Sequence, residues 1–466
     1  MLKIGNQICR SFPAIFSVIT VLALVSSTRA QSPATDQTVV LKDARVIDGA
    51  GGPAIEHGAI VIQGDRIVSV GPVEQVHWPK SAQVVGYRGK TVLPGLISDH
   101  SHVGQVDGTG TGPQNYNRSN ILRQLRQYEV YGVTTVTALG LNGNLFYELQ
   151  PQLHSGLLPG SDLFGADRGI GIPNGAPPTF NLPEAQLYRV ATVEQAVQAV
   201  DETATRKPDL VKLWIDDFHG SLRVKMSPEV YRAAIQEAHK LGFRVAAHIY
   251  YLSDAKSLVS AGVDIIAHGV RDQPVDAEFI SLMKTHQVWY IPTISLDESS
   301  YIYAEKPAWL NDQFLDHALQ PALAAELHDA DWRAKTLGNQ KQVEAGKASV
   351  ATNERNLKTL FDAGVNIGFG TDSGATALRI PGFAEHRELE LIVDAGLTPL
   401  QAISLATAKA ASLLHLEDRG VLAAGKLADL IVVDGNPATQ IKDTRNIEAV
   451  WQRGKLVSKK VQDFTP

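Results

Sequence analysis

Leu96-Ile97-Ser98-Asp99-His100-Ser101-His102 is a strand-like segment that ends in two histidines separated by one residue. Side chains two positions apart in a β-strand lie on the same face of the sheet. Both imidazoles can therefore point the same way and bind one metal ion. Histidine pairs of this kind are also common on protein surfaces, so the interpretation depends on what the rest of the chain places beside this pair.

Three further strand-like segments end in residue types that bind metal ions. His248 ends FRVAAH, His268 ends VDIIAH and Asp372 ends VNIGFGTD. Imidazole nitrogen and carboxylate oxygen suit zinc and similar divalent ions. Any one of these histidines alone is most simply a hydrogen-bonded core residue. Four histidines and an aspartate, all at the carboxyl ends of strands, instead predict a metal centre.

Strand-like and helix-like segments alternate over residues 94–418. This pattern predicts an α/β fold with a parallel sheet, specifically a (β/α)8 TIM barrel, whose active site lies at the carboxyl ends of the strands. A helical insertion over about residues 304–363 is expected to form a lid or a homo-oligomer contact. The eight strand candidates lie near residues 96–102, 133–138, 161–166, 209–215, 243–249, 263–268, 287–294 and 365–371.

Both ends of the chain have a different, all-β character. Residues 36–93 contain short apolar runs and a hairpin signal at Gln63-Gly64-Asp65, and residues 419–466 contain a second hairpin signal at Arg453-Gly454. We expect the two segments to pair into one composite small β domain, a β-sandwich, beside the barrel.

The first thirty residues resemble a cleavable signal peptide, with basic Lys3 and Arg10, an apolar stretch and small residues before residue 31. This predicts an exported protein, periplasmic or secreted. The alternative is a membrane anchor, for which the apolar stretch is short. Cleavage would remove Cys9, the only cysteine, and change the formal charge from −6 to −9. No stable membrane partner is expected after cleavage, and the acidic chain without a basic run argues against nucleic acid.

Lys212 lies inside the apolar segment LVKLWI. Alternation places Lys212 and Trp214 on one strand face, and this face points into the barrel if the other packs on helices. A buried lysine needs a partner, so the simple alternative is an ion-paired or snorkelling side chain. The functional interpretation is a lysine carboxylated by CO2, which turns a cation into an anion able to bridge two metal ions.

Together these motifs resemble the amidohydrolase superfamily of metal-dependent hydrolases. VLPGLI before DHSH resembles the family's entry motif, with Ser98 as a slight departure, and GKLADL at residues 425–430 resembles its return to the small β domain. The resemblance implies a binuclear centre, with zinc as the expected metal and cobalt, manganese or iron as alternatives. His100, His102 and Asp372 would bind one ion, His248 and His268 the second, and N6-carboxylated Lys212 would bridge them.

The resemblance also implies a mechanism and a substrate class. Asp372 would be the catalytic residue that takes a proton from a metal-bridging hydroxide and passes it to the leaving group. The segments DLVK, EHRELEL and AGLTP at residues 209–212, 385–391 and 395–399 are most similar to the prolidase and Xaa-Arg carboxypeptidase-like branch. That branch cleaves amide or peptide C–N bonds, so N-acyl amino acids or dipeptide-like small molecules are the expected substrates.

Other functions stay open. The same binuclear site could act on a cyclic amide, lactone, carbamate or phosphotriester. A mononuclear deaminase is another alternative, against which Lys212 argues. A non-catalytic relative would be expected to have lost metal ligands. Candidate substrate-binding residues are Arg168, which could hold a carboxylate or pair with Asp167 in its loop, Tyr250, which follows His248 closely, and His386.

Overall fold

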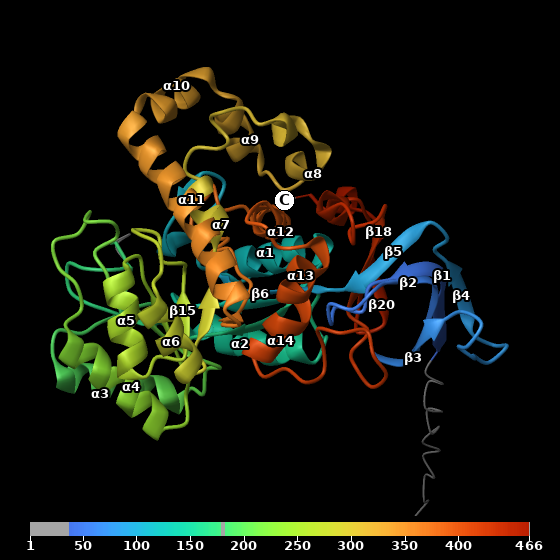
Figure 1. The fold of residues 1–466 in the computed structure, drawn as a ribbon, viewed down its shortest axis with the longest axis horizontal. Coiled ribbons are helices and arrows are strands. Elements are labelled where there is room, and N and C mark those ends of the chain that lie inside the picture. The colour runs from blue at the N-terminus through green and yellow to red at the C-terminus, as the bar shows by residue number, and fades with distance from the viewer. Residues whose placement is uncertain (1–36, 179–181, 466) are drawn as a thin grey trace, which may run out of the picture. The chain divides into compact units, whose positions relative to one another are not determined.

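Residues 37–178 and 182–465, which the computed structural model describes, form an α/β fold with mixed sheets (Figure 1). The predicted signal peptide, residues 1–30, and Cys9 lie outside the described residues, so export stays a prediction. Among the helices of the described ranges, none is long and apolar enough to cross a membrane.

The two ends of the chain share one eight-stranded mixed sheet. The early strands β1 to β5 and the late strands β18 to β20 are joined where β18 pairs antiparallel with β5, so strands from both terminal segments belong to one sheet. Both predicted hairpins are present, as β2–β3 and β19–β20. The strands are β1 (Thr38–Val46), β2 (Ile55–Gln63), β3 (Arg66–Pro72), β4 (Gln83–Gly86), β5 (Lys90–Pro94), β18 (Leu430–Asp434), β19 (Ile447–Gln452) and β20 (Lys455–Ser458).

The middle of the chain contains two parallel sheets. One has the order β10-β9-β6 and the other β12-β11-β13-β14-β15-β16-β17. Each of the eight predicted strands is present, although most are shorter than predicted. The strands are β6 (Leu96–Ser101), β9 (Val133–Ala138), β10 (Asp162–Gly165), β11 (Ile170–Gly171), β12 (Tyr188–Arg189), β13 (Val211–Trp214), β14 (Val245–His248), β15 (Ile265–Ala267), β16 (Trp289–Ile291) and β17 (Asn366–Ile367).

Single parallel bridges connect these two sheets on both sides. Ala166, just after β10, is bridged to Leu210, just before β13, and Ser101 of β6 is bridged to Ser373 after β17. A short hairpin, β7 (Val106–Asp107) with β8 (Gly110–Thr111), and the short strands β11 and β12 were not predicted from the sequence.

Helices follow the parallel strands, as the alternation predicted. Asn117, Thr192 and Asp276 cap the starts of α1, α3 and α6 by accepting backbone N–H groups, which satisfies donors that helix ends leave unpaired. In Figure 1, α3 to α6 lie together beside the strands. These helices are α1 (Arg118–Val130), α2 (Asn144–His154), α3 (Val193–Thr205), α4 (Pro228–Lys240), α5 (Leu252–Ala261) and α6 (Ala277–Thr285), followed later by α12 (Phe383–Asp394), α13 (Pro399–Ser404) and α14 (Ala410–Leu413).

The predicted insertion is helical. It contains α8 (Gln313–Asp316), α9 (Pro321–His328), α10 (Ala330–Gly338) and α11 (Gln340–Asp362), and it follows the short helix α7 (Ile294–Glu298). The long helix α11 leads back toward the strands and contacts α7 (Figure 1).

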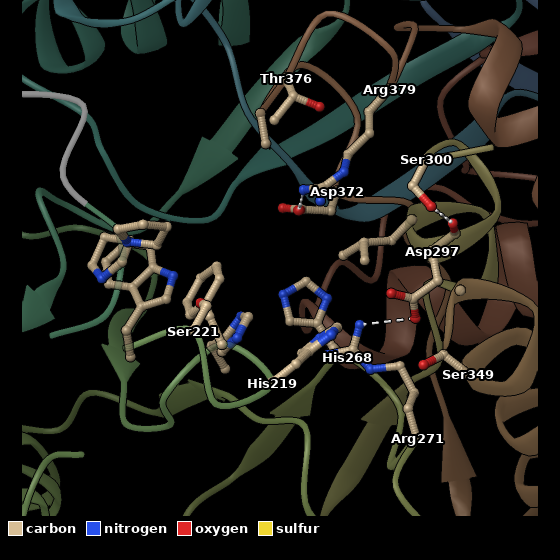
Figure 2. Close-up of a pocket in the computed structure, with 18 of the residues that line it drawn as sticks. His219, Ser221, His268, Arg271, Asp297, Ser300, Ser349, Asp372, Thr376 and Arg379 are labelled. Carbon is tan, nitrogen blue, oxygen red and sulfur yellow. Dashed lines mark hydrogen bonds and ion pairs between the residues drawn. The ribbon is translucent and has the colours of Figure 1, made fainter. Parts of the chain in front are cut away.

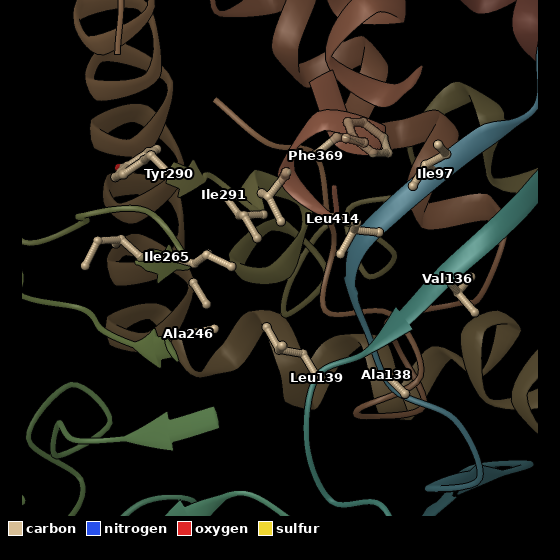
Figure 3. Close-up of a cluster of buried hydrophobic side chains, with 14 of the residues drawn as sticks. Ile97, Val136, Ala138, Leu139, Ala246, Ile265, Tyr290, Ile291, Phe369 and Leu414 are labelled. Carbon is tan, nitrogen blue, oxygen red and sulfur yellow. The ribbon is translucent and has the colours of Figure 1, made fainter. Parts of the chain in front are cut away.

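Apolar side chains from many strands meet in one large core. Figure 3 shows part of this cluster, with residues of β6, β9, β14, β15 and β16 together with Phe369 and Leu414. The terminal sheet has a smaller cluster of its own around Ile60 and Leu430. Because each strand end is anchored in buried apolar packing, the polar side chains at the strand ends are held in defined places.

Candidate metal centre and cavity

His100, His102 and Asp372 form a close cluster at the end of β6. Backbone bonds align the segment after β17 with β6: the amides of Thr371 and Asp372 donate to the His100 carbonyl at 3.0 and 2.8 Å, and the His102 amide donates to Ser373 at 2.7 Å. Oδ1 of Asp372 lies 3.2 Å from Nε2 of His100 and 3.0 Å from Nε2 of His102. One ligand atom from each residue lies within 4.8 Å of the other two, so they could hold one metal ion.

His248, His268 and Lys212 lie next to this cluster. The His268 ring centroid is 4.4 Å from that of His100 and 4.5 Å from that of His248. Lys212 is 1% exposed, and β13 pairs with β14 so that Trp214 lies opposite His248. The structure therefore brings all six predicted metal-centre residues to one place, although among the described residues only the first three meet the close spacing of a single site.

Several buried polar atoms in this centre have no hydrogen-bond partner. They include both ring nitrogens of His100, Nδ1 of His102, Nε2 of His248 and Nζ of Lys212. The 3.2 Å distance between Nε2 of His100 and Oδ1 of Asp372 is thus a contact without hydrogen-bond geometry. Buried polar groups without partners are costly, and imidazole nitrogens left in this state beside the Asp372 carboxylate fit divalent metal binding.

The protonation states also fit metal binding. Burial, helped by Lys212, lowers the pKa of His100 to about 3, and burial lowers the pKa of His268 well below its ordinary value. Burial acts to raise the pKa of Asp372, but Arg379 and the two imidazoles outweigh it and bring the value well below ordinary. Metal ligands must be neutral imidazoles and ionised carboxylates, which are the forms favoured here.

The amine of Lys212 is also affected by burial. Burial lowers its pKa to about 7, although the nearby carboxylates of Asp372 and Asp216 act in the opposite direction. The Lys212 ammonium is therefore destabilised where the sequence predicted a modified, anionic lysine.

Outer partners orient the two remaining histidines. Nε2 of His248 lies 3.2 Å from Oδ1 of the fully buried Asp216, and Nδ1 of His268 lies 2.9 Å from the hydroxyl of Thr293. The hydrogen bond with Thr293 fixes the His268 ring and leaves its Nε2 for a metal, whereas Asp216 approaches Nε2 of His248 without hydrogen-bond geometry. His268, Thr293 and Asp372 also have positive φ values of 93°, 46° and 59°, a strained conformation that is typical of functional sites.

A cavity of about 380 Å³ opens onto the centre, with His102, His248, His268 and Asp372 in its lining (Figure 2). This volume lies within the range of small-molecule sites. One part of the wall is apolar and the other is charged. The larger apolar residues of the lining are Leu141, Pro177, Pro178, Trp214, Phe218 and Leu296.

The charged part of the wall contains two ion pairs. Nη1 of Arg271 lies 3.1 Å from Oδ2 of Asp297, and Nη1 of Arg379 contacts Oδ2 of Asp372. Figure 2 shows the first pair on one side of His268, with Arg379 reaching toward Asp372 on another. The insertion contributes Gln342, Gly346 and Ser349 of α11 to the cavity, so it forms part of the wall.

The three predicted substrate-binding residues lie outside the lining of this cavity. The Arg168 guanidinium stacks over the ring of Tyr188, with 4.6 Å between its carbon and the ring centroid. Tyr250 lies directly behind the wall, where it stacks on His219 at 3.8 Å. His386 is buried, and its ring nitrogens contact Thr444 and the Tyr131 carbonyl at 3.0 and 2.8 Å. Their positions give no support to contact with substrate, which stays a prediction for each.

Sequence reasoning missed Asp216, Arg271, Asp297 and Arg379. Asp216 had a signal, because it follows Lys212 by four residues and a strand places such residues on one face. Arg379 had none, since it lies in the loop after Asp372, where no regular periodicity applies.

The sequence profile of the amidohydrolase family matches residues 91–457. The chain belongs to this family. Amidohydrolase relatives include a 5-methylthioadenosine/S-adenosylhomocysteine deaminase of Bacillus thuringiensis (strain Al Hakam), 25% identical over 394 residues that cover 82% of this chain and 81% of the relative.

Solved amidohydrolase structures are similar over most of the chain. A prolidase-like protein from Bifidobacterium longum has a TM-score of 0.73 and 26% identity, covering 91% of this chain and 96% of its own. A prolidase solved with N-methylphosphonate-L-proline has a TM-score of 0.70 and 26% identity, covering 91% of this chain and 100% of its own. The chain is therefore a member of a metal-dependent hydrolase family that acts on C–N bonds.

Proposed function

We propose that this protein is an exported, binuclear metal-dependent hydrolase that cleaves the amide bond of N-acyl amino acids or dipeptide-like substrates. The observation that carries the proposal is the buried set His100, His102, Lys212, His248, His268 and Asp372 beside one cavity. It includes Lys212, whose buried amine has no hydrogen-bond partner and which we take as the bridging ligand in its carboxylated form.

The fold supports this placement. We infer that the eight predicted parallel strands, connected by the bridges at Ala166 and Ser101, close into a (β/α)8 barrel, and that the terminal sheet is the small β-sandwich domain. The site residues then occupy the carboxyl ends of barrel strands, where this architecture places its active sites.

His100, His102 and Asp372 would hold one divalent ion, with zinc as the expected metal, and His248 and His268 the second, with carboxylated Lys212 between them. Such ions supply Lewis-acid activation of water and of the scissile carbonyl. Asp372 holds Oδ1 toward the imidazoles and Oδ2 toward the cavity cation Arg379. Arg379 and the two imidazoles lower the pKa of Asp372, which favours the ionised carboxylate, and this group would receive a proton and return it to the leaving nitrogen.

The cavity supports an amino-acid-derived amide. An apolar wall built on Trp214 and Phe218 would take an acyl group or an apolar side chain, and the charged wall would take a polar end. Similarity to prolidase structures over 91% of the chain agrees with this substrate class.

The test is metal content together with hydrolysis. We expect about two zinc ions per chain in protein purified with bicarbonate, release of free amino acid from a panel of N-acyl amino acids and dipeptides, and loss of activity on chelation. The Lys212→Ala variant should lose one metal ion and most of its activity. Lys240 is an exposed lysine on α4, so the Lys240→Ala variant should keep two ions and wild-type activity. Two ions retained in Lys212→Ala would contradict the bridging role.

A mononuclear deaminase is the second candidate, favoured by the 25% identity to the Bacillus thuringiensis deaminase. It predicts one ion per chain, indifference of metal content to Lys212→Ala, and ammonia release from 5-methylthioadenosine. The same purified protein and the same panel, with this nucleoside added, separate the two functions.

Export and assembly complete the proposal. The predicted signal peptide would direct the chain to the periplasm or the medium. Determination of the first residue of the mature protein tests whether this segment is cleaved. Within the insertion, α11 would form part of the cavity wall and the outer helices would form a contact in a homo-oligomer. The mass of the protein in solution tests the oligomer.

A further inference from the structure

The cavity contains two arginines whose charges are balanced in different ways. Arg271 has two polar anchors, since Nη1 pairs with Asp297 at 3.1 Å and Nη2 donates to the Ile249 carbonyl at 2.9 Å, while its Nε, like that of Arg379, is buried without a hydrogen-bond partner. Among the described residues, Asp372 is the only carboxylate within 4.0 Å of Arg379. Nε of Arg379 is buried without a hydrogen-bond partner.

The loop that carries Arg379 is fixed beside the centre. The amide of Gly374 donates to the Arg379 carbonyl at 2.8 Å, and the Arg379 amide donates to Thr376 at 3.1 Å. This short turn begins two residues after Asp372, so it returns the guanidinium to the carboxylate of that residue. The Arg379 side chain is 21% exposed and lines the cavity, and is therefore within reach of a bound molecule.

The charge balance of Arg379 depends on whether Asp372 also binds a metal ion. Asp372 belongs to the cluster that could hold a metal ion, and the positive charge of the ion would compete with the guanidinium for this carboxylate. Because Oδ1 of Asp372 faces the imidazoles and Oδ2 faces Arg379, an ion held on Oδ1 would draw negative charge from the carboxylate and leave the charge of Arg379 only partly balanced. Arginine presents paired donors that match a carboxylate.

We propose that Arg379 is the receptor for the substrate's carboxylate, and that the same guanidinium holds Asp372 when no metal ion is bound. The ligand class is an amino-acid-derived molecule with a free carboxylate near the scissile bond, and this rests on the proposed function. The proposal gives this role to Arg379, which lines the cavity, whereas Arg168 stacks on Tyr188 outside the lining.

The first test measures carboxylate recognition by calorimetry with two probes that cannot be hydrolysed, L-methionine and L-methioninol. The zinc-loaded wild-type protein should bind the acid about 10–100-fold more tightly than the alcohol, the range of a charge-assisted hydrogen-bond pair. Arg379→Met should reduce the ratio to near one, and Arg379→Lys should keep part of it. Arg355→Met, an exposed arginine on α11, is the matched control and should keep the wild-type ratio.

The second test measures metal affinity without any substrate. Arg379→Met should bind its first zinc ion about tenfold more tightly than the wild-type protein, because the competing cation is removed from Asp372. A merely structural arginine would weaken zinc binding or leave it unchanged when removed, and either result would overturn the proposal.

The outcomes separate this inference from the proposed function. Absence of amide hydrolysis with an intact acid preference would reject the proposed function and keep the carboxylate receptor. An acid preference that persists in Arg379→Met, or a wild-type protein with no preference for the acid, including one that binds neither probe, would overturn the receptor.

Discussion

The hydroxyl of Ser98 donates a hydrogen bond of 3.2 Å to Oε1 of Glu385. The same carboxylate oxygen accepts 2.6 Å hydrogen bonds from Thr371 and Ser373, which flank Asp372 in sequence. One buried carboxylate thus ties the histidine strand β6 to the segment that carries Asp372. Ser98, the departure from the usual entry motif, is the link on the β6 side.

Glu385→Gln should weaken both stability and metal binding. The amide has one acceptor oxygen and no charge for three hydroxyl donors, so we expect a loss of about 1–3 kcal/mol in the free energy of unfolding. Zinc affinity should fall by about tenfold or more, since such outer partners position metal ligands. Denaturant unfolding and zinc titration check this, with exposed Glu417→Gln as the control. A less stable protein with wild-type zinc affinity would reduce Glu385 to a structural role.

The strand-end residues could be predicted from the sequence because alternation and strand direction determine where they point. His100, His248 and Asp372 each end a short apolar run, and parallel strands bring such ends together. The links between them could not be predicted, since Glu385 and Ser98 are 287 positions apart. Arg379 was equally hidden, because only the conformation of its loop returns it to Asp372.

Asp216→Asn should affect the second metal ion selectively. Asp216 lies 3.2 Å from Nε2 of His248 without hydrogen-bond geometry, so its carboxylate acts on this ring through its negative charge. We expect the affinity for the second zinc ion to fall by about 10–100-fold with the first site intact. Asp217→Asn is the neighbouring control, because Asp217 instead accepts from Gly220 and Tyr251. Equal losses at both sites would contradict this role.

Glu388 should make stability depend on pH near neutrality. This buried carboxyl accepts the amides of Ile294 and Ser295 at 2.8 and 2.7 Å, yet burial raises its pKa from 4.5 to about 7. The folded protein therefore binds the proton more tightly than the unfolded chain. Its contribution is fully present below pH 4.5 and is lost as the pH rises through 7.

The glutamine of Glu388→Gln cannot titrate. Between pH 5 and pH 8, the free energy of unfolding of this variant should therefore fall by on the order of 1–3 kcal/mol less than that of the wild-type protein. A constant offset from the lost acceptor leaves this slope unchanged. Denaturant unfolding at several pH values measures it, with exposed Glu229→Gln on α4 as the control. Parallel curves for the wild-type protein and Glu388→Gln would refute the assignment.

Gly374 should be irreplaceable, because it lies between the metal cluster and the Arg379 turn. Its φ is +77°, and a Cβ there would overlap the His102 carbonyl oxygen. Gly364 offers a matched comparison, with φ of +76° and nothing within 4 Å of a Cβ. Gly364→Ala should cost only the strain of the left-handed backbone, about 1–2 kcal/mol.

Gly374→Ala should lose about 1–3 kcal/mol more of the free energy of unfolding than Gly364→Ala, because its Cβ overlaps a neighbouring atom. It should also reduce zinc affinity, since relief of this overlap must move His102 or the segment after Asp372. Unfolding and zinc titration of the two variants separate strain from displacement. Equal losses of stability, with equal zinc affinity, would show that the approach of Gly374 to His102 does not hold the metal cluster in place.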